Sequence, residues 1–374
     1  MKIGITCYPT YGGSGAVATE LGIALAARGH SVHFITYEQP FRLPLFVPRI
    51  TFHEVSLGHY PLFQYPPYDL ALAVKMHEVA LEQQLDLLHV HYAIPHATSA
   101  LLAKQMLAEA GQRLPVVTTL HGTDITIVGQ DHSYHAITKY SIEKSDAITA
   151  VSRFLKEETI RAFGCDNCRV DVIPNFVDPR TFNPGHRDAA LRADLAGDRP
   201  VMMHISNFRP VKRVRDIVAT FARVRERLPA VLVMIGDGPE RGAAEEEARR
   251  LGVRGDVRFL GRIDAVAPLL SIADVYILTT DRESFGLSAL EAQASGVPVV
   301  AAGVGGIPEV VEDGVTGALR PVGDVAGFAD ATLTLLTDRA LWERQSAAAV
   351  ERARRLFDVN DVVSGYEDVY ASVI

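Results

Sequence analysis

Short apolar runs alternate with helix-length amphipathic segments along almost the whole chain. The first series of runs that predict β-strands covers residues 3–7, 32–36, 87–91, 116–120, 147–151 and 170–173. A second series covers residues 201–205, 231–235, 257–260, 275–278 and 297–301. Strands that alternate with helices form parallel sheets with helices on both faces. The pattern therefore predicts an α/β protein with two Rossmann-like domains.

The boundary between the two domains is expected in the proline-rich stretch 174–199, after which a strand resumes at Val201. We assign residues 1–178 to the first domain and residues 179–357 to the second. The last segment, 358–374, has a helical pattern, and we expect it to join the first domain. Connections of this kind allow two domains to close over a ligand.

Composition and charge exclude several classes of protein. The chain has 374 residues, of which 48% are hydrophobic and 22% are charged, as in an ordinary globular protein. A net charge of −8 argues against a nucleic-acid-binding protein, which usually carries a basic excess. Three cysteines are too few for a disulfide framework, and no apolar run reaches the ~18 residues of a membrane span. We expect a cytoplasmic protein without membrane insertion, and a homodimer is left open.

The segment 283–291 begins and ends with a glutamate and is expected to be a loop that enters a helix near Phe285. On that helix Glu283 would precede the N-terminus and Glu291 would lie about two turns in. Free N–H groups at a helix N-terminus attract anions, and a carboxylate beside them can accept hydrogen bonds from hydroxyl groups. The motif is therefore a candidate sugar-nucleotide site, and the alternative is a capped helix with a solvated Glu face.

Glycines at positions 12, 13 and 15 follow the first predicted strand and precede a helix. Without side chains there, backbone N–H groups can approach a phosphate or sugar closely. The segment is not the dinucleotide fingerprint, because no third glycine lies three residues after Gly15.

Two cations follow the first strand of the second domain. Arg209 and Lys212 are spaced to converge on one anion at the start of the next helix. The chain has no Asp-x-Asp pair for a divalent metal, and Cys165 and Cys168 lack the two further ligands of a structural zinc site. No metal or cofactor is expected, so Arg, Lys and helix amides would neutralise a diphosphate. The alternative is that both cations are solvated surface residues.

The helix predicted over residues 211–228 carries six basic residues. Such a helix can lie on an anionic membrane. Because Asp216 and Glu226 interrupt the positive charge, we favour a core helix with a solvated basic face.

Polar residues follow several strands of the first domain. His121 ends one buried strand, and Tyr92 and His96 follow another. The carboxyl ends of parallel strands face the crevice where such sheets bind ligands, so these side chains are candidates for hydrogen bonding or proton transfer. Asn175, which follows a further strand, is either a hinge or a site residue.

In their order along the chain these features resemble glycosyltransferase family 4, whose members are retaining enzymes of the GT-B architecture, with two Rossmann-like domains facing across a cleft. The resemblance rests on residues 12–15, 28–32, 121–122, 151–152, 174–175, 209, 212, 236–239, 261–262 and 283–291. Within the family, residues 12–15, 91–96, 121–126 and 206–213 are most similar to the branch that attaches N-acetylglucosamine to L-malate at the start of bacillithiol synthesis.

The resemblance implies UDP-N-acetylglucosamine as the donor. It implies that Glu291 accepts the ribose hydroxyls, that Glu283 holds the donor sugar near its 3- and 4-hydroxyls, and that His121 contacts the sugar near its 6-hydroxyl. Arg209 and Lys212 would stabilise the departing UDP. The other implied donor contacts are Gly13, Ser14, Gly15, Asn207, Arg262, Phe285, Gly286 and Leu287.

One departure affects the phosphate contact. Many family members have the phosphate arginine one residue after a glycine at the strand end, where this chain has Ser206 and Asn207. Arg213 is therefore an alternative to Arg209.

The resemblance implies L-malate as the acceptor. The candidates to hold its carboxylates are Ser14, Tyr92, Thr119 and Arg153. No protein nucleophile is assigned in the retaining members, and a front-face reaction is implied in which the leaving phosphate takes the proton of the acceptor.

Other functions share parts of this pattern. An inositol-phosphate or sugar-phosphate acceptor would require extra cations in the first domain. A UDP-sugar epimerase or hydrolase could have the same fold, but an epimerase needs acid and base groups on opposite faces of the sugar, and no second group is evident. A non-catalytic sensor could lose Glu283 or His121, and both are present.

Overall fold

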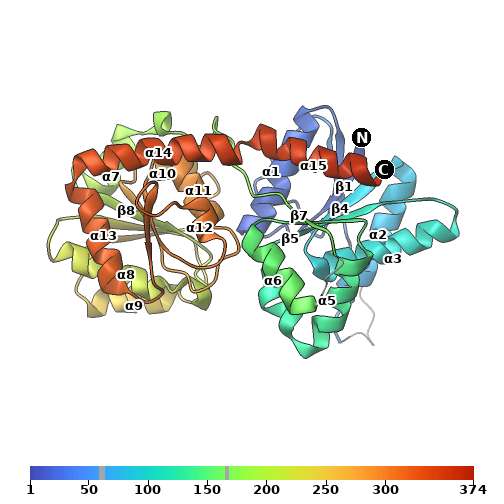
Figure 1. Cartoon of the computed structure of the whole chain (residues 1–374), viewed down its shortest axis with the longest axis horizontal. Helices are drawn as coiled ribbons and strands as arrows, with labels where there is room; N and C mark the ends of the chain where they lie inside the picture. The colour runs from blue at the N-terminus through green and yellow to red at the C-terminus, as the bar shows by residue number, and fades with distance from the viewer. Residues whose placement is uncertain (59–63, 165–167) are drawn as a thin grey trace. The chain divides into compact units, whose positions relative to one another are not determined.

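The structure, a computed structural model, describes residues 1–58, 64–164 and 168–374 (Figure 1). The chain forms two compact units. The first consists of Met1–Pro174 together with Asn360–Ile374, and the second of Asn175–Val359. Each unit is built on one parallel sheet. The predicted α/β class with two Rossmann-like domains is confirmed.

The first unit contains a 7-stranded sheet in the order β3-β2-β1-β4-β5-β6-β7. Its strands are β1 (Lys2–Thr6), β2 (Ser31–Thr36), β3 (Ile50–Glu54), β4 (Leu87–His91), β5 (Val116–Leu120), β6 (Ala147–Ala150) and β7 (Val170–Val172). Its α-helices are α1 (Gly13–Ala27), α2 (Tyr68–Gln83), α3 (Thr98–Glu109), α4 (Thr123–Thr126), α5 (His132–Lys144), α6 (Arg153–Phe163) and α15 (Val359–Val373). The strand order reverses between β1 and β4, so the loops after these two strands flank a topological switch point, where α/β sheets bind ligands.

The two faces of the first sheet differ in character. Leu88 and Val90 of β4 belong to an apolar core with Met76 of α2 and other residues of α2 and α3. Side chains alternate along a strand, so His89 and His91 point to the opposite face, where Figure 1 shows α1 and α15. The hydroxyl of the buried Tyr370 of α15 lies 2.7 Å from His89 Nδ1. The C-terminal helix therefore packs on a polar stripe of the first sheet.

The second unit contains a 6-stranded sheet in the order β10-β9-β8-β11-β12-β13. Its strands are β8 (Val201–Ile205), β9 (Val231–Ile235), β10 (Val257–Gly261), β11 (Val275–Leu278), β12 (Val299–Ala302) and β13 (Gly317–Arg320). Its α-helices are α7 (Ala189–Ala196), α8 (Val214–Arg225), α9 (Arg241–Arg250), α10 (Ala267–Ser271), α11 (Leu287–Ala294), α12 (Ile307–Val310), α13 (Val325–Thr337) and α14 (Arg339–Phe357). Here the switch point lies between β8 and β11.

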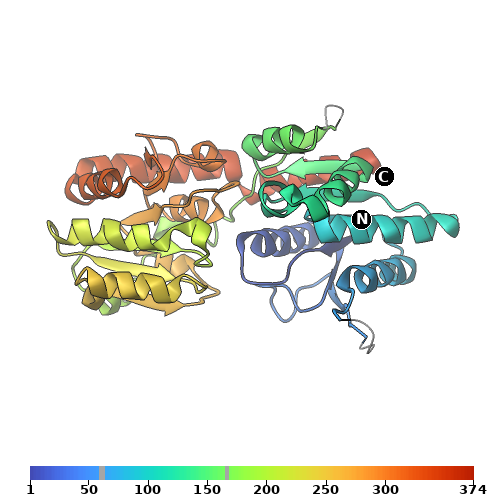
Figure 2. The same ribbon diagram turned by 90° about the horizontal axis from the view of Figure 1, so that it is seen from below.

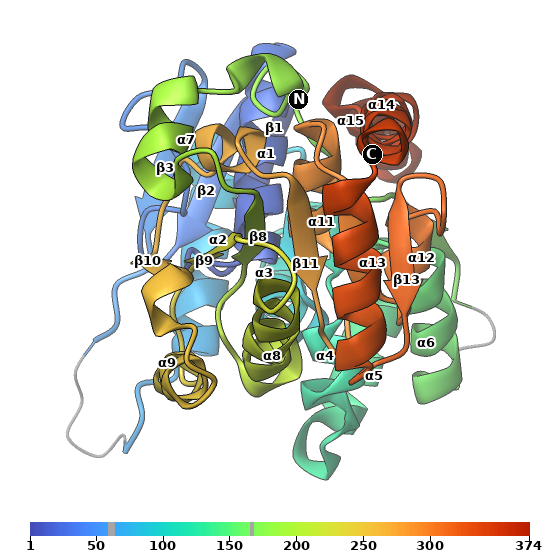
Figure 3. The ribbon, with the colours of Figure 1, turned by 90° about the vertical axis from the view of Figure 1, so that its left-hand side faces the viewer.

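One face of the second sheet is covered by α8, α9 and α13, which lie side by side in Figures 2 and 3. Ile217 and Phe221 of α8 share a buried core with Met234 of β9 and Phe328 of α13. The basic residues of α8 lie outside this core. The expected core helix with a solvated basic face is therefore observed.

Two helices begin later than the sequence pattern predicts. The segment expected to be helical from residue 211 starts with a 3-10 turn at Pro210–Lys212, and α8 begins only at Val214. Arg213 between them has a left-handed backbone conformation with φ 49°, which the α-helix cannot continue through. In the same way α11 begins at Leu287, because Gly286 before it has φ 98°.

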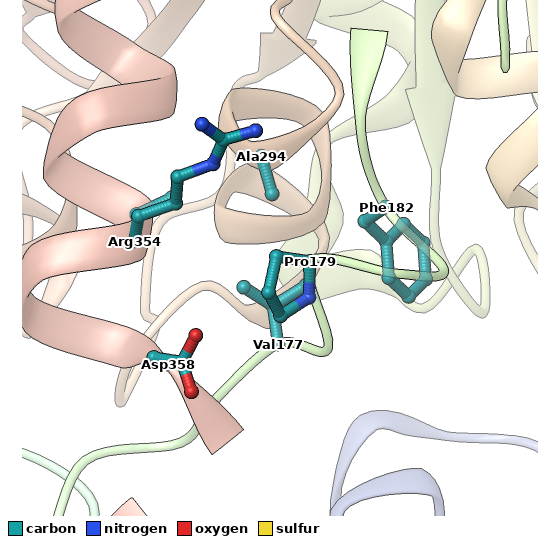
Figure 4. Close-up of a pocket in the computed structure, with 7 residues that line it drawn as sticks. Val177, Pro179, Phe182, Ala294, Arg354 and Asp358 are labelled. Atoms are coloured by element: carbon teal, nitrogen blue, oxygen red, sulfur yellow. The ribbon is translucent and has the colours of Figure 1, made fainter. Parts of the chain in front are cut away.

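A small recess of the second unit lies where the segment after residue 175 meets the end of α14 (Figure 4). It is lined by Val177, Pro179, Phe182, Ala294, Ala353, Arg354 and Asp358. Two backbone hydrogen bonds join these two segments, from Val177 N to Phe357 O (2.9 Å) and from Val359 N to Val177 O (3.2 Å). Because the recess is too narrow to admit a water molecule, we regard it as packing that anchors this segment to α14.

Two further findings concern the expected surroundings of the protein. In the part of the chain that the structure describes, no helix has both the length and the apolar character needed to cross a bilayer. Cys7 is buried and has a free thiol. Cys165 of the Cys-x-x-Cys pair lies outside the described residues.

Candidate active site

In the second unit, the loops after the switch-point strands β8 and β11 are bonded to each other. The hydroxyl of Thr280 donates to Val211 O at 2.9 Å, and Asp281 N donates to the same oxygen at 3.0 Å. The hydroxyl of Thr279 lies 3.1 Å from Lys212 O. These bonds fix the backbone of the turn that carries Lys212 against the loop that carries Glu283.

The side chains of Lys212 and Glu283 meet at this junction. Lys212 Nζ lies 2.6 Å from Glu283 Oε2, and each side chain is 19% exposed. The pair is a charge-assisted hydrogen bond at a half-buried position. The two residues are 71 positions apart in the chain, and they are two of the site residues expected from the sequence.

The two arginines considered for the phosphate contact differ in their surroundings. Arg213 is bound to Asp216, with its Nε 2.8 Å and a terminal nitrogen 2.7 Å from the same carboxylate oxygen. Arg209 is exposed, and within residues 1–58, 64–164 and 168–374 no ion pair holds its guanidinium. Arg209 is therefore the cation that a ligand can reach without breaking an existing ion pair.

Helix α11 begins directly after this loop. Its first residue is Leu287, so Glu291 lies about one turn in rather than the expected two. Glu291 is buried, with 3% exposure, whereas Glu283 keeps part of its surface accessible. Phe285 is buried against Phe357, with ring centroids 5.6 Å apart. The two glutamates thus lie in distinct environments: Glu291 is buried within α11, and Glu283 is partly accessible in the loop before its N-terminus.

The loop after β12 was not anticipated from the sequence, and it supports Glu283. Gly306 N donates to Glu283 O at 2.9 Å. A Cβ atom on Gly306 would lie only 2.1 Å from Ser284 O, so only glycine allows this approach. A signal was present, because Gly303, Gly305 and Gly306 follow a predicted strand and precede a helix, as the glycines of the first domain do.

The loops after β9 and β10 complete this edge of the second sheet. Gly238 packs so closely on the loop after β8 that a Cβ there would lie 2.0 Å from Asn207 O. Asn207 Oδ1 is buried, and the described residues offer it no hydrogen-bond partner. Arg262 follows β10 and is exposed. Asn207 therefore retains a free acceptor at the edge where Lys212 and Glu283 lie.

In the first unit, the N-terminus of α1 lies at the switch point. Gly15 approaches the preceding loop so closely that a Cβ would be 2.7 Å from Tyr8 O. No side chain caps the first turn of α1, which holds Gly13 and Ser14. Tyr92, from the loop after β4, donates its hydroxyl to Ser14 Oγ at 3.0 Å. The structure thus brings Ser14 and Tyr92 together beside amides that can bind an anion.

His121 belongs to a group of histidines next to Tyr92. Its Nε2 lies 2.8 Å from His91 Nδ1, and its ring centroid is 5.2 Å from that of Tyr92. Burial, and to a smaller extent the neighbouring His96, lowers the pKa of His121 to about 3. His121 is therefore neutral at physiological pH and suited to hydrogen bonding rather than to carrying a proton. The Nε2 atoms of His91 and His96 are buried and have no partner among the described residues.

Three other candidate residues predicted from the sequence are Thr119, Arg153 and Asn175. Thr119 is fully buried, and its hydroxyl lies 2.7 Å from both His89 Nε2 and Thr149 Oγ1. Its hydroxyl is therefore engaged on the face that α15 covers, whereas its carbonyl oxygen accepts a hydrogen bond from Tyr92 N at 2.9 Å. Arg153 is exposed at the first position of α6. Asn175 is buried, and its Oδ1 has no partner among the described residues.

A buried carboxylate, Asp124, was not singled out from the sequence. It accepts a hydrogen bond from Ala93 N at 3.0 Å and another from Gly122 N at 2.9 Å. Burial raises its pKa to about 6, although these N–H groups act in the opposite direction. The available signal was an acidic residue three positions after a candidate site histidine.

The structure contains no candidate metal centre in its described part: no three His, Cys, Asp or Glu side chains there are grouped so that they could hold an ion. Arg209 and Lys212 are the cations of the second unit that were predicted from the sequence to meet an anion.

Comparison with known proteins gives matches over most of the chain. Residues 11–181 match the family model described as Glycosyltransferase Family 4, and residues 199–338 match the model described as Glycosyl transferases group 1. The chain is 48% identical to the N-acetyl-alpha-D-glucosaminyl L-malate synthase of Bacillus anthracis, an alignment that covers 100% of this chain and 97% of the relative. It is 31% identical to the D-inositol 3-phosphate glycosyltransferase of Kribbella flavida, over 92% of this chain and 87% of that one.

Solved structures show the same fold at lower sequence identity. Anabaena HepE in complex with UDP and glucose has a TM-score of 0.81 at 21% identity, with 100% of both chains covered. The sucrose-phosphate synthase of Thermosynechococcus elongatus has a TM-score of 0.80 at 23% identity, with 99% of this chain and 98% of that chain covered. At these identities the structures establish the fold alone.

Proposed function

This chain belongs to glycosyltransferase family 4, as its sequence predicted, and we propose that it transfers N-acetylglucosamine from UDP-N-acetylglucosamine to the hydroxyl of L-malate with retention of the α configuration. The observation that carries the proposal is the 48% identity to the Bacillus anthracis N-acetyl-alpha-D-glucosaminyl L-malate synthase over the full chain. The reaction would be the first step of bacillithiol synthesis, as expected from the sequence.

The proposed nucleotide contacts lie in the second unit. Glu291 accepts the ribose hydroxyls, and the amides of Gly286 and Leu287 meet the phosphates at the start of α11. Arg209 and Lys212 supply positive charge to the diphosphate. Because Arg209 has no ion pair in the described part of the chain whereas Arg213 is bound to Asp216, Arg209 is the better candidate for the second cation. Asn207 Oδ1 and the backbone near Arg262 are proposed to bind the remainder of the nucleotide.

Two residues are proposed to hold the donor sugar. Glu283 accepts hydrogen bonds from the 3- and 4-hydroxyls, and His121 contacts the 6-hydroxyl. The 2.6 Å bond between Lys212 and Glu283 keeps both side chains in place before the donor arrives. When the donor binds, this ion pair separates, because Lys212 binds the diphosphate and Glu283 binds the sugar hydroxyls. Each charged side chain therefore has a partner both before and after binding.

The proposed chemistry needs no protein nucleophile. The bond from the sugar C1 to the phosphate oxygen breaks, and the malate hydroxyl oxygen bonds to C1 from the same face. The hydroxyl proton passes to the leaving phosphate oxygen, so UDP departs with its negative charge stabilised by Lys212 and Arg209. Ser14, Tyr92, Arg153 and the first amides of α1 are proposed to bind the malate carboxylates. Thr119 is proposed to act indirectly, because its carbonyl oxygen accepts a hydrogen bond from Tyr92 N.

Identification of the product tests this proposal. The protein is incubated with UDP-N-acetylglucosamine and L-malate, and the anomeric signal of the product is followed by NMR. We expect an α-linked N-acetylglucosaminyl malate, with a much lower rate for Glu283→Gln and an unchanged rate for Glu343→Gln, a control at an exposed glutamate of α14. A β-linked product, or free N-acetylglucosamine alone, would contradict the proposal.

A further inference from the structure

Asp124 joins the two loops that carry His121 and Tyr92. It lies in the first turn of α4 and is 2% exposed. Its Oδ1 accepts from Gly122 N at 2.9 Å, and its Oδ2 accepts from Ala93 N at 3.0 Å. Gly122 follows His121 in the loop after β5, and Ala93 follows Tyr92 in the loop after β4. One carboxylate thus binds the backbone next to both side chains.

We propose that Asp124 is a positioning residue of the transfer reaction, whose ionised carboxylate holds the loops of Tyr92 and His121 together and whose protonation loosens them. The inference rests on the proposed function, because that function assigns His121 to the donor sugar and Tyr92 to the acceptor. Asp124 itself touches neither substrate in this proposal.

The bridge requires a carboxylate. Both partners of Asp124 are backbone N–H donors, so both of its oxygens must accept. An asparagine presents a donor NH2 group to the second N–H, so one of the two loops loses its hydrogen bond and an unsatisfied buried N–H remains. A protonated aspartic acid replaces one carboxylate oxygen by a hydroxyl oxygen, which accepts far more weakly, so the same bond is weakened.

The titratable side chains around Asp124 stay neutral in mildly acidic solution, so Asp124 is the group there that changes charge. Tyr8 and Tyr92 face it from the loops after β1 and β4. Burial, and to a smaller extent the charge of Asp124, raises the pKa of both phenols, which therefore stay neutral. His121 and His96 have pKa values lowered by burial to about 3 and about 4, so they stay neutral as well. Among the described residues, no charged group of the elements packed on α4 shifts the pKa of Asp124, which burial raises to about 6.

The first test compares the pH dependence of kcat for malate-dependent UDP release in the wild type and in Asp124→Asn. We expect the wild-type kcat to fall below about pH 6 as Asp124 takes up a proton. The variant should have a kcat at least about tenfold lower at pH 8, because misplaced groups slow a positioned reaction strongly, and it should lack the acid limb near pH 6. Its affinity for UDP, proposed to bind the second unit, should be unchanged.

The matched control is Asp131→Asn. Asp131 is an exposed aspartate of the same unit that caps α5 by accepting from Ser133 N at 2.8 Å, and asparagine caps helices equally well. This control should keep both the wild-type kcat and the acid limb. The inference would be overturned if Asp124→Asn had the same kcat as the wild type and the same loss of activity below about pH 6.

A second measurement does not depend on activity or on the folding of a variant. The side-chain carboxyl of Asp124 and the amides of Ala93 and Gly122 are followed by NMR in the wild-type protein between pH 4 and pH 8. We expect all three to titrate together with a midpoint near 6. A carboxyl midpoint below 4.5, or amides that do not respond, would refute the inference. If instead the wild type titrates as expected but shows no malate-dependent UDP release, the proposed function fails while the carboxylate bridge stands.

Discussion

Gly306 offers the sharpest test of how the donor loops are held. The change Gly306→Ala adds one methyl group to the loop after β12. The new Cβ would lie 2.1 Å from Ser284 O, 2.7 Å from Ser284 C and 3.1 Å from Phe285 Cα. All three neighbours are backbone atoms, so no flexible side chain can move aside. The backbone of Gly306 has φ −81°, which alanine adopts without strain, so the substitution tests the close contact alone.

The magnitude follows from the distance. Relief of the contact requires the loops after β11 and β12 to separate by roughly 1 Å, and overpacking of this kind costs about 1–3 kcal/mol of folding free energy. Gly306 N also binds Glu283 O at 2.9 Å, so the shift moves the backbone of Glu283. A displacement of about 1 Å at a positioned group lowers turnover by on the order of 100-fold. We therefore expect a large loss of kcat together with a moderate loss of stability.

The assay combines kcat for malate-dependent UDP release with the free energy of unfolding from urea denaturation. The control is Gly242→Ala in α9, where a Cβ meets no atom within 4 Å. Alanine is favoured over glycine inside a helix by about 1 kcal/mol, so this variant should be slightly more stable and fully active. A Gly306→Ala protein with wild-type kcat and wild-type unfolding free energy would refute the claim that this contact positions Glu283.

Three further predictions concern single side chains. Lys212→Met should weaken UDP binding by about 1.5–3 kcal/mol in calorimetry, the range for a hydrogen bond to a charged group, and an unchanged Kd would exclude Lys212 from the phosphate contact. The raised pKa of Asp124, 3.8 to about 6, means that the folded state binds its proton more tightly than the unfolded state between these values. Its contribution to the free energy of unfolding should therefore fall by about 3 kcal/mol as pH rises from 4 to above 6. Asp124→Asn should remove this pH dependence, which urea denaturation at each pH measures. Parallel plots of unfolding free energy against pH for the wild type and the variant would contradict the prediction. Tyr370→Phe leaves His89 Nδ1 buried without its 2.7 Å partner and should lower the free energy of unfolding by about 1–3 kcal/mol while kcat at 25 °C is retained; a wild-type stability would show that this bond does not hold α15.

Most strands that the sequence predicted are buried along most of their length, although the partly exposed edge strands β7 and β10 were predicted as well. Central strands such as β9 and β11 are buried at every position, so they appear as continuous apolar runs. The edge strands β3 and β13 are partly exposed, and their sequences contain Thr, His, Glu, Gly and Arg. A short half-exposed strand has neither an apolar run nor a clear alternation, and sequence periodicity cannot distinguish it from a loop.

The candidate site could be predicted only in part for a similar reason. Glu283 and Lys212 were predicted as site residues because each lies at a recognisable strand end or helix start. Their direct ion pair joins residues 71 positions apart and depends on the strand order, which the sequence pattern does not specify. Gly306 and Asp124 were missed because their roles arise from close backbone contacts across loops that are distant in the chain.

The most direct test of the central claim is UDP release from UDP-N-acetylglucosamine by the purified protein in the presence of EDTA. Three parallel reactions contain L-malate, inositol phosphate or no acceptor. The proposed function predicts rapid release with L-malate alone, at a rate that EDTA does not change. Release that requires inositol phosphate would contradict the assigned acceptor, and equal release without any acceptor would contradict a transferase and indicate a hydrolase or an epimerase.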